Sequence, residues 1–352
     1  MSYITKSRLL TLLKVFIPLG IGIFLLWHFY QSMDVNTKLI FYKAIQEANY
    51  FWIGLSVLLG LLSHAIRAYR WKYVLEPLGY HTKFKHRFYA VMSGYLINLL
   101  IPRAGEASRA ALLYNSDGVP FSKGVGTIIS ERIVDTIMLA FFLLLTLYVG
   151  FQDLIHVKDI IIHNHNEAEA SETNQLILII LLGIIAIGIL VFSILWIKSD
   201  TFRSKLKKFI ADLIFGVLSI FKTKKPFHFI LQSLSIWILY LLYFAVCFYA
   251  FEETQQIPTQ GILIGFIAGT LGITFTNGGV GAYPYLVGIV VSYYIGAQLD
   301  STEQAEGIGK ALGLIIWVAQ TLMMIVIGLI SLVLIPKKFK IKNNEQMGTN
   351  TK

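Results

Sequence analysis

The chain has 352 residues, of which 56% are hydrophobic and 14% charged, and its formal net charge is +10 at pH 7. A water-soluble domain carries about a quarter charged residues, so this composition excludes an ordinary soluble protein and indicates a polytopic membrane protein. The positive charge lies mainly in loops beside apolar runs, and we therefore expect no nucleic acid as a partner.

Six apolar runs are long enough to cross about 30 Å of hydrocarbon as helices. The first run resembles a signal peptide, but it is too long for one and lacks a small-residue cleavage site, so we expect a retained span. The single cysteine, Cys247, lies within an apolar run and is predicted to be a packing residue. The expected spans are roughly 9–30, 50–74, 125–150, 174–197, 227–251 and 311–335.

Two further apolar regions are interrupted at their centres. Residues 86–114 break at Pro102-Arg103-Ala104-Gly105, and residues 259–296 break at Asn277-Gly278-Gly279-Val280-Gly281. A half of about 14 residues extends only about 21 Å as a helix, too short for a comfortable crossing. We therefore expect two re-entrant helical hairpins, whose broken backbone must be buried in protein or line a cavity.

Lysine and arginine set the predicted orientation. With both termini cytoplasmic and each hairpin returning to its side of entry, the cytoplasmic segments hold 22 of the 30 basic residues and the external segments only four. The first hairpin then enters from the cytoplasm and the second from outside, as in inverted-repeat transporters, which bind substrate near the midplane. We expect one all-α membrane domain over residues 1–336 in the plasma or inner membrane, and a disordered basic cytoplasmic tail at 337–352. Residues 203–221 predict a basic interfacial helix.

The first hairpin contains Arg103, Glu106 and Arg109, which share one face if the segment is helical. One interpretation is a structural ion pair, because the glutamate can pair with either arginine. The other is an anion site, because two positive charges exceed one negative charge and an arginine fork suits phosphate. A helix that begins near Ala104 or Gly105 would add its positive end to that site.

Charged residues also flank the site in the neighbouring spans. Arg67 and Arg70 are either membrane-interface anchors or the lining of a headgroup entrance. Glu131 and Asp135 share a helix face, with Arg132 between them. We expect them to neutralise Arg67 or Arg103, or alternatively to couple proton movement.

Polar and small residues at the two breaks complete the candidate site. Asn98 and Asn277 are expected to donate hydrogen bonds there, and glycines in the second break let the backbone approach a ligand closely. Those glycines are Gly278, Gly279 and Gly281. The pair His163-x-His165 is typical of a solvated loop, so we expect no metal, and nothing in the sequence indicates a cofactor.

The motif order resembles a known family. Its members share the pattern seen here as Arg67-x-x-Arg70-Trp71, Gly94-Tyr95-x-x-Asn98-x-x-x-Pro102-x-x-Gly105-Glu106-x-x-Arg109, Glu131-Arg132-x-x-Asp135 and Gly278-Gly279-Val280-Gly281. This pattern resembles the lysylphosphatidylglycerol synthetase transmembrane-domain family, the flippase-like region of multiple peptide resistance factors, over about residues 8–335. The family often has proline where Asn277 stands and an acid where Pro284 stands, which argues against an acid acting in that hairpin.

The resemblance implies a lipid flippase or transporter that moves a phosphate-bearing lipid, anionic or polyprenyl-phosphate-linked, between leaflets. Arg103 and Arg109 would bind the phosphate and Glu106 would orient them. Larger relatives carry a cytosolic aminoacyl-transferase domain after the membrane part, and we expect this chain to lack it and not to be an enzyme. Two alternatives stay open: an intramembrane transferase with Glu106, Glu131 or Asp135 as base, and a non-catalytic partner of an envelope-biosynthesis enzyme.

Overall fold

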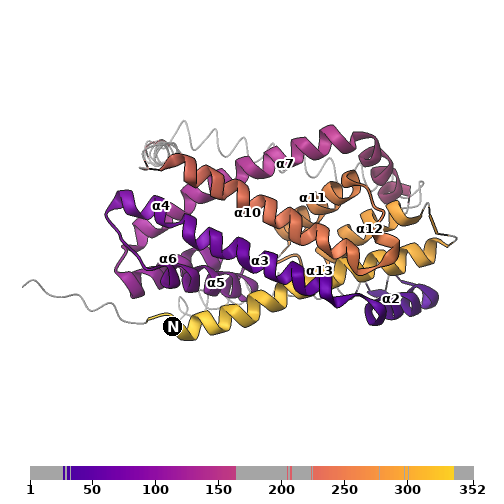
Figure 1. Cartoon of the computed structure of the whole chain (residues 1–352), viewed down its shortest axis with the longest axis horizontal. Coiled ribbons are helices and arrows are strands. Elements are labelled where there is room, and N and C mark those ends of the chain that lie inside the picture. The colour runs from indigo at the N-terminus through magenta and orange to yellow at the C-terminus, as the bar shows by residue number, and fades with distance from the viewer. Residues whose placement is uncertain are drawn as a thin grey trace, which may run out of the picture.

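The computed structural model describes residues 33–163, 225–276, 278–296 and 301–336, with a few isolated positions outside these ranges. Every regular element within them is a helix, which confirms the predicted all-α bundle (Figure 1). The expected spans at 9–30 and 174–197 and the basic tail fall outside the continuously described ranges. The same holds for the predicted interfacial helix at 203–221.

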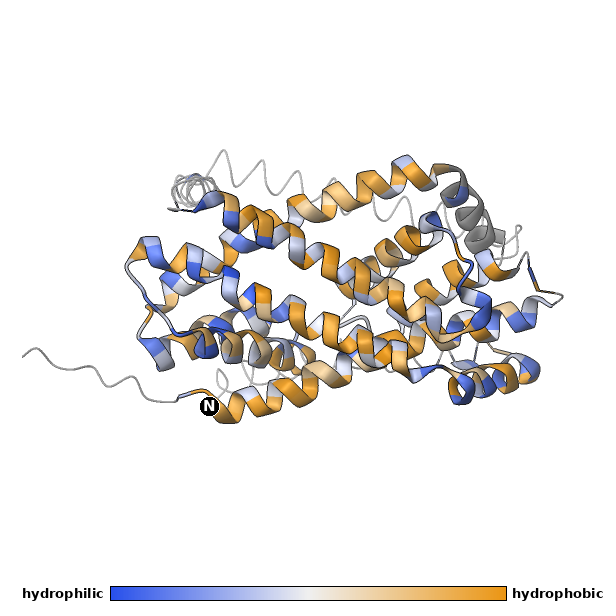
Figure 2. Cartoon of the chain, viewed as in Figure 1, coloured by the Kyte–Doolittle hydropathy of each residue, from blue (hydrophilic) through white to orange (hydrophobic). Residues whose placement is uncertain are grey.

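In the part of the chain that the structure describes, four helical segments are long and apolar enough to cross a membrane, and each overlaps a predicted span. Their outward surfaces carry many exposed aliphatic and aromatic side chains, as expected for helices that face lipid. Figure 2 shows apolar residues along the middle of these helices and hydrophilic residues gathered at the two ends of the bundle. The main helices are α3 (Tyr50–Arg70), α7 (Phe121–His163), α10 (Pro226–Val246) and α13 (Thr302–Leu334).

Helix α13 begins at Thr302, nine residues before the predicted start of that span. Ser301 caps it, because its hydroxyl accepts a hydrogen bond from the amide of Gln304. Lys310 is buried within the helix, and its Nζ lies 2.8 Å from Glu306 Oε2. Prediction from hydropathy missed this first part of the helix because charged residues interrupt the apolar pattern there.

Both predicted hairpins are present. The first consists of α5 (Phe84–Leu100) and α6 (Ala104–Asp117), and the second of α11 (Thr259–Phe275) and α12 (Ala282–Gly296). These helices have 14 to 17 residues, so each is about 21 to 26 Å long and crosses only part of a bilayer. Each hairpin turns at the break that the sequence indicates.

The two hairpins enter the bundle from opposite ends. In Figure 1, α5 and α6 lie at the end that carries α4 (Lys72–Leu75), whereas α12 lies toward the end that carries α2 (Val35–Glu47). Their tips meet inside the bundle, because a Cβ atom added at Gly278 would lie 2.8 Å from Leu99 Cδ2. The predicted opposite orientation of the hairpins is therefore observed.

Tight backbone contact holds the first hairpin closed. A Cβ atom at Gly94 would lie 2.9 Å from the carbonyl oxygen of Gly105, and one at Gly105 would collide with the carbonyl oxygen of Gly94. Helices α5 and α6 can pack at this distance only because both positions lack a side chain. The motif glycines thus bring the tip of the hairpin together.

Helix α2 lies between the predicted spans 9–30 and 50–74, in a segment where no helix was predicted. Asp34 caps it: Oδ1 accepts a hydrogen bond from the amide of Thr37 at 2.6 Å, and hydrogen bonds from Thr37 lower the pKa of Asp34. Phe41 and Ala44 point into the bundle. The remaining short elements are η1 (Glu76–Leu78), η2 (Cys247–Ala250) and η3 (Glu252–Thr254).

Two large apolar clusters form most of the described interior. One joins α10 to α13 and includes Cys247, which is free and fully buried as a packing residue. The other surrounds Trp71 and joins α4, α5, α6 and the start of α7.

Candidate functional site

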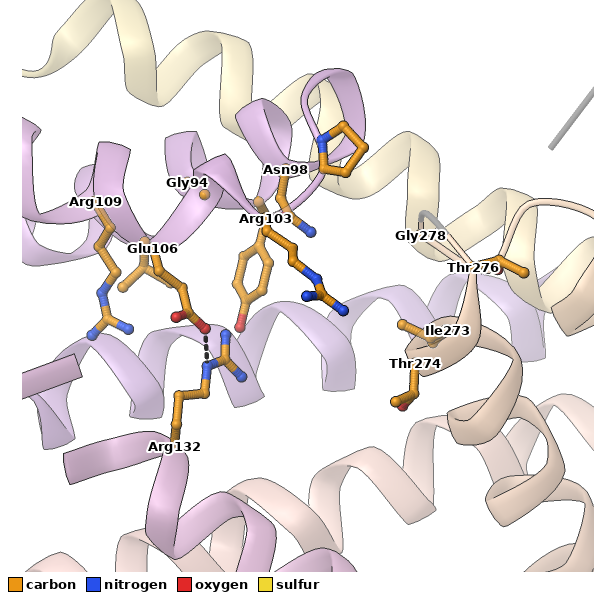
Figure 3. A pocket seen from close by; sticks show the side chains of 14 residues that line it. Gly94, Asn98, Arg103, Glu106, Arg109, Arg132, Ile273, Thr274, Thr276 and Gly278 are labelled. Atoms are coloured by element: carbon orange, nitrogen blue, oxygen red, sulfur yellow. Dashed lines mark hydrogen bonds and ion pairs between the residues drawn. The ribbon is translucent and has the colours of Figure 1, made fainter. Parts of the chain in front are cut away.

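A cavity of about 520 Å³ lies where the two hairpin tips meet. The first hairpin supplies most of its charged and polar wall, α7 adds one arginine, and the end of α11 forms the opposite wall (Figure 3). The lining residues used below are Tyr95, Asn98, Arg103, Glu106, Arg109, Arg132, Thr274, Thr276 and Gly278. Asn98, Arg103, Glu106, Arg109 and Gly278 are predicted site residues, and the structure brings them together.

Arg103 stands at the tip of the first hairpin, directly before α6. Its backbone has φ 62°, and it is the one non-glycine residue with positive φ in the described part of the chain. This left-handed conformation costs about 1 to 3 kcal/mol for such a residue and is typical of functional positions. The guanidinium of Arg103 points into the cavity (Figure 3), and it forms no ion pair with any described carboxylate.

Glu106 forms an ion pair with Arg132 of α7 across the cavity wall (Figure 3). Helical spacing predicted Arg103 or Arg109 as its partner. The difference arises because Arg103 lies outside the helix in a left-handed turn, and Arg109 is held by another carboxylate. The side chains of Glu106 and Arg132 are both about half exposed, so this pair is accessible from the cavity.

Arg109 lies deeper than the other cavity arginines. Its Nη2 donates to Glu131 Oε2 at 2.6 Å, and its guanidinium carbon lies 3.7 Å from the ring centroid of Trp71. Trp71 is fixed in turn, because its indole N–H donates to Thr127 Oγ1 at 2.9 Å. A guanidinium that is paired and stacked in this way forms part of the rigid wall and has little freedom to move toward a ligand.

Arg67 and Arg70 do not line the cavity. Arg67 Nη1 lies 2.6 Å from Asp135 Oδ2, and its Nη2 donates to the hydroxyl of Tyr240 at 3.2 Å. Arg70 Nη1 lies 3.0 Å from Asp135 Oδ1, and its Nε lies 3.4 Å from Glu131 Oε1. Both arginines are buried and neither lines the cavity, whereas the sequence had left open membrane-interface anchors or the lining of a headgroup entrance.

This network ties four helices together, because Glu131 also pairs with Arg109 of α6. Asp135 and Glu131 of α7 pair with arginines of α3, and Arg70 Nη1 also donates to Ser233 Oγ of α10 at 2.7 Å. The expected pairing of Asp135 with Arg67 is observed, whereas Arg103 takes no part. The hydrogen-bonding capacity of the guanidinium groups is only partly used. Three of their nitrogen atoms are buried without a hydrogen-bond partner: Arg67 Nε, Arg70 Nη2 and Arg109 Nε.

The second hairpin contributes a tight glycine turn. Gly278, Gly279 and Gly281 have φ of 68°, 79° and 72°, values that favour glycine at each position. Only Gly278 of these three lines the cavity, and its carbonyl oxygen accepts a hydrogen bond from the indole of Trp317 at 2.8 Å. Asn277 lies outside the described residues.

Three polar lining residues were not predicted. Thr274 Oγ1 donates to the carbonyl of Thr270 at 2.8 Å, and Thr276 Oγ1 donates to the carbonyl of Gly272 at 2.6 Å. With their protons used inside the helix, both hydroxyls present lone pairs to other donors. Tyr95 is the third. For Thr274 and Thr276, their position just before the helix break was the signal in the sequence that could have identified them.

The arrangement of charges favours binding of an anion. Guanidinium groups, an asparagine amide and the start of α6 all border one partly enclosed space at the hairpin tips. Within the described ranges, no group of three or more His, Cys, Asp or Glu side chains is arranged to hold a metal ion. The chemistry that these residues offer is recognition of a charged group.

The sequence of the chain matches a known family. The sequence profile described as the lysylphosphatidylglycerol synthase TM region matches residues 15–299. A UPF0104 membrane protein of Methanocaldococcus jannaschii is 33% identical over 149 residues, which is 42% of this chain and 40% of that relative. The alignment thus spans less than half the length of this curated relative. No solved structure gives a significant match.

Proposed function

Because this chain belongs to the lysylphosphatidylglycerol synthase TM region family, we propose that it is a flippase that moves a phosphate-bearing lipid between the leaflets of a membrane. The observation that carries this proposal is the cavity between two oppositely entering hairpins, lined by Arg103 and Arg132. Broken helices that meet inside a bundle are typical of secondary transporters, which place the substrate at that point.

The lipid phosphate would bind between Arg103 and Arg132. Arg103 forms no ion pair with a described carboxylate. Arg132 pairs with the half-exposed Glu106, and its Nη1 lies a longer 3.8 Å from Asp135 Oδ2. Both guanidinium groups can therefore turn fork-like donors toward phosphate oxygens. Arg109 would form the positive base of the site and Asn98 would donate a further hydrogen bond. This assignment replaces Arg109 with Arg132 as the second mobile ligand.

The acyl or prenyl tails would remain in the bilayer during transport. Leu100 and Ile101 at the first tip and Ile273 near the second are exposed apolar side chains beside the cavity. They provide a surface for the lipid chain while the charged headgroup crosses between the hairpins. The headgroup thereby avoids the cost of passing through hydrocarbon, which is several kcal/mol for a charged group (on the order of 3 by insertion scales).

The sidedness of the molecule follows from its charges. The turn before α5 and the segment before α10 carry exposed lysines, such as Lys83 and Lys225, whereas the opposite end carries Glu47, Glu252 and Glu303. On the positive-inside rule we propose that the first end is cytoplasmic and that the protein lies in the cell membrane, and the sequence predicts both termini on the same side. An envelope-biosynthesis enzyme that makes or uses the lipid is the expected protein partner.

Transport by the purified protein tests this proposal. The full chain is reconstituted in liposomes that contain a fluorescent anionic phospholipid, and loss of signal to a membrane-impermeant quencher reports exchange between leaflets. Arg103→Asn should reduce exchange at least about tenfold, because it removes an uncompensated guanidinium. Asparagine tolerates the left-handed backbone, so folding should be retained. The matched control Lys85→Gln removes an exposed charge from the same hairpin and should leave exchange unchanged.

The outcomes also separate the alternative functions. Equal exchange by the wild type and Arg103→Asn would refute the phosphate role. Formation of a new lipid when an aminoacyl or sugar donor is added would favour a transferase. Exchange that requires a co-reconstituted envelope enzyme would favour a partner role.

A further inference from the structure

The buried charges behind the cavity do not balance. Arg67, Arg70 and Arg109 are buried together with Glu131 and Asp135, and these two carboxylates supply all of their ion pairs within the described residues. Arginine stays protonated at any accessible pH, and net charge in a low-dielectric interior is costly unless a counter-ion lies nearby. The buried part of the network therefore carries an excess of one positive charge.

The cavity wall adds a second positive charge. Glu106 and Arg132 neutralise each other, and Arg103 faces the cavity without an ion pair to a described carboxylate. Both excess charges border the same space, because Arg103 and Arg109 line it together. The described charged groups at the site thus leave two positive charges for a ligand to neutralise.

We propose that the site takes a phosphate group with two negative charges, a terminal phosphomonoester or a diphosphate, in preference to a singly charged phosphodiester. This inference rests on the proposed function and names the charge class of its ligand. A phosphomonoester carries about −1.5 to −2 charges at pH 7 and has three acceptor oxygens. It can therefore bind Arg103 and Arg132 at the same time, and its negative charge offsets the excess positive charge of the buried network behind them.

The cavity also has room for this group. Its volume is about 520 Å³, which matches the range of about 300 to 1,000 Å³ for small-molecule sites. Thr274 and Thr276 line the cavity from the second hairpin, and each hydroxyl has already donated its proton to a backbone carbonyl. A hydroxyl group beyond the phosphate can donate to them, whereas the anionic phosphate oxygens are better placed on the arginine side.

Lipid binding to the purified protein in detergent tests this inference independently of transport. The purified full chain is incubated with equal amounts of phosphatidic acid and phosphatidylglycerol of identical acyl chains, and native mass spectrometry measures which lipid is retained. We expect phosphatidic acid to be favoured by at least about tenfold, which corresponds to about 1.4 kcal/mol. A second arm with a polyprenyl monophosphate shows whether the chain recognises the phosphate alone or a particular lipid tail as well.

Two variants test whether the charge excess causes the preference. Arg103→Asn removes one excess charge and should bring the retention ratio close to one, with unchanged thermal unfolding. Lys85→Gln, the exposed control, should keep the wild-type ratio. Equal retention of both lipids by the wild type, preference for phosphatidylglycerol, or retention of neither would overturn the inference.

The liposome assay then distinguishes the two proposals. If phosphatidic acid is retained preferentially but no lipid is exchanged, the flippase function is refuted and the preference for a doubly charged phosphate is supported. If both lipids are exchanged equally and neither is retained preferentially, the preference for a doubly charged phosphate is refuted and the flippase function is supported.

Discussion

Asp135 is the carboxylate on which two buried arginines depend. Its Oδ2 lies 2.6 Å from Arg67 Nη1 and its Oδ1 lies 3.0 Å from Arg70 Nη1. Asp135→Asn keeps the size and shape of the side chain but removes its charge. The new amide also turns an N–H group toward one of the guanidinium groups, where two donors would face each other.

The expected loss of stability follows from burial. Removing one partner of a buried ion pair costs about 3 to 5 kcal/mol, because the other charge stays buried without compensation. Asp135 pairs with two buried arginines and also lies 3.8 Å from Arg132 Nη1, which places the expected loss at about 4 to 5 kcal/mol on that scale. Glu131 continues to pair with Arg70 and Arg109, so the bundle should still fold. Equilibrium unfolding in mixed micelles, followed by circular dichroism, measures the difference in unfolding free energy.

An exposed ion pair in the same chain provides the control. Lys43 and Glu47 lie 3.9 Å apart, and their side chains are 72% and 66% exposed. Glu47→Gln should change the unfolding free energy by less than about 1 kcal/mol, because exposed pairs contribute little. If Asp135→Asn stays within about 1 kcal/mol of the wild type, the network does not hold α3 to α7 and the reasoning is wrong.

Further predictions concern packing and the deep arginine. Gly105→Ala should lower the unfolding free energy by about 1 to 3 kcal/mol, because the added methyl group collides with the carbonyl of Gly94. Gly126→Ala, where no atom lies within 4 Å of an added Cβ, should instead raise it by about 0.5 to 1 kcal/mol by favouring the helix. Trp71→Phe should cost about 1 to 2 kcal/mol, since it removes an indole hydrogen bond and weakens the stacking on Arg109. The same unfolding assay checks all three, and a reversed order of the two glycine variants would contradict the packing argument.

Much of the architecture was accessible from sequence because it depends on local quantities. The length of an apolar run decides whether a helix can cross the bilayer, and Pro102 and the glycines from Gly278 to Gly281 mark the points where it cannot. Loop lysines and arginines then predicted that the hairpins enter from opposite sides. Where charges interrupt an apolar pattern, as at Glu306 and Lys310, the same rule placed the start of α13 too late.

The charge pairings were less accessible, because they depend on contacts between distant segments. Helical spacing alone suggested that Glu106 pairs within its own helix, yet Arg132 is its partner across 26 positions of sequence. The left-handed backbone of Arg103 removes that residue from the helical face on which the prediction was based. Spacing identifies residues that share a face, but it does not show which neighbouring helix competes for them.

The arginines at this site divide by their freedom to move. Those of α3 are buried and paired with carboxylates of α7, so a phosphate could reach them only after ion pairs that fix the bundle had opened. Arg103 and Arg132 face the cavity, one without a described carboxylate partner and the other in an accessible pair. Arg109 links the two sets, since it lines the cavity while Glu131 and Trp71 hold it in place. A rigid positive wall behind two mobile guanidinium groups would allow a headgroup to bind and leave without disrupting the ion pairs that hold the helices together.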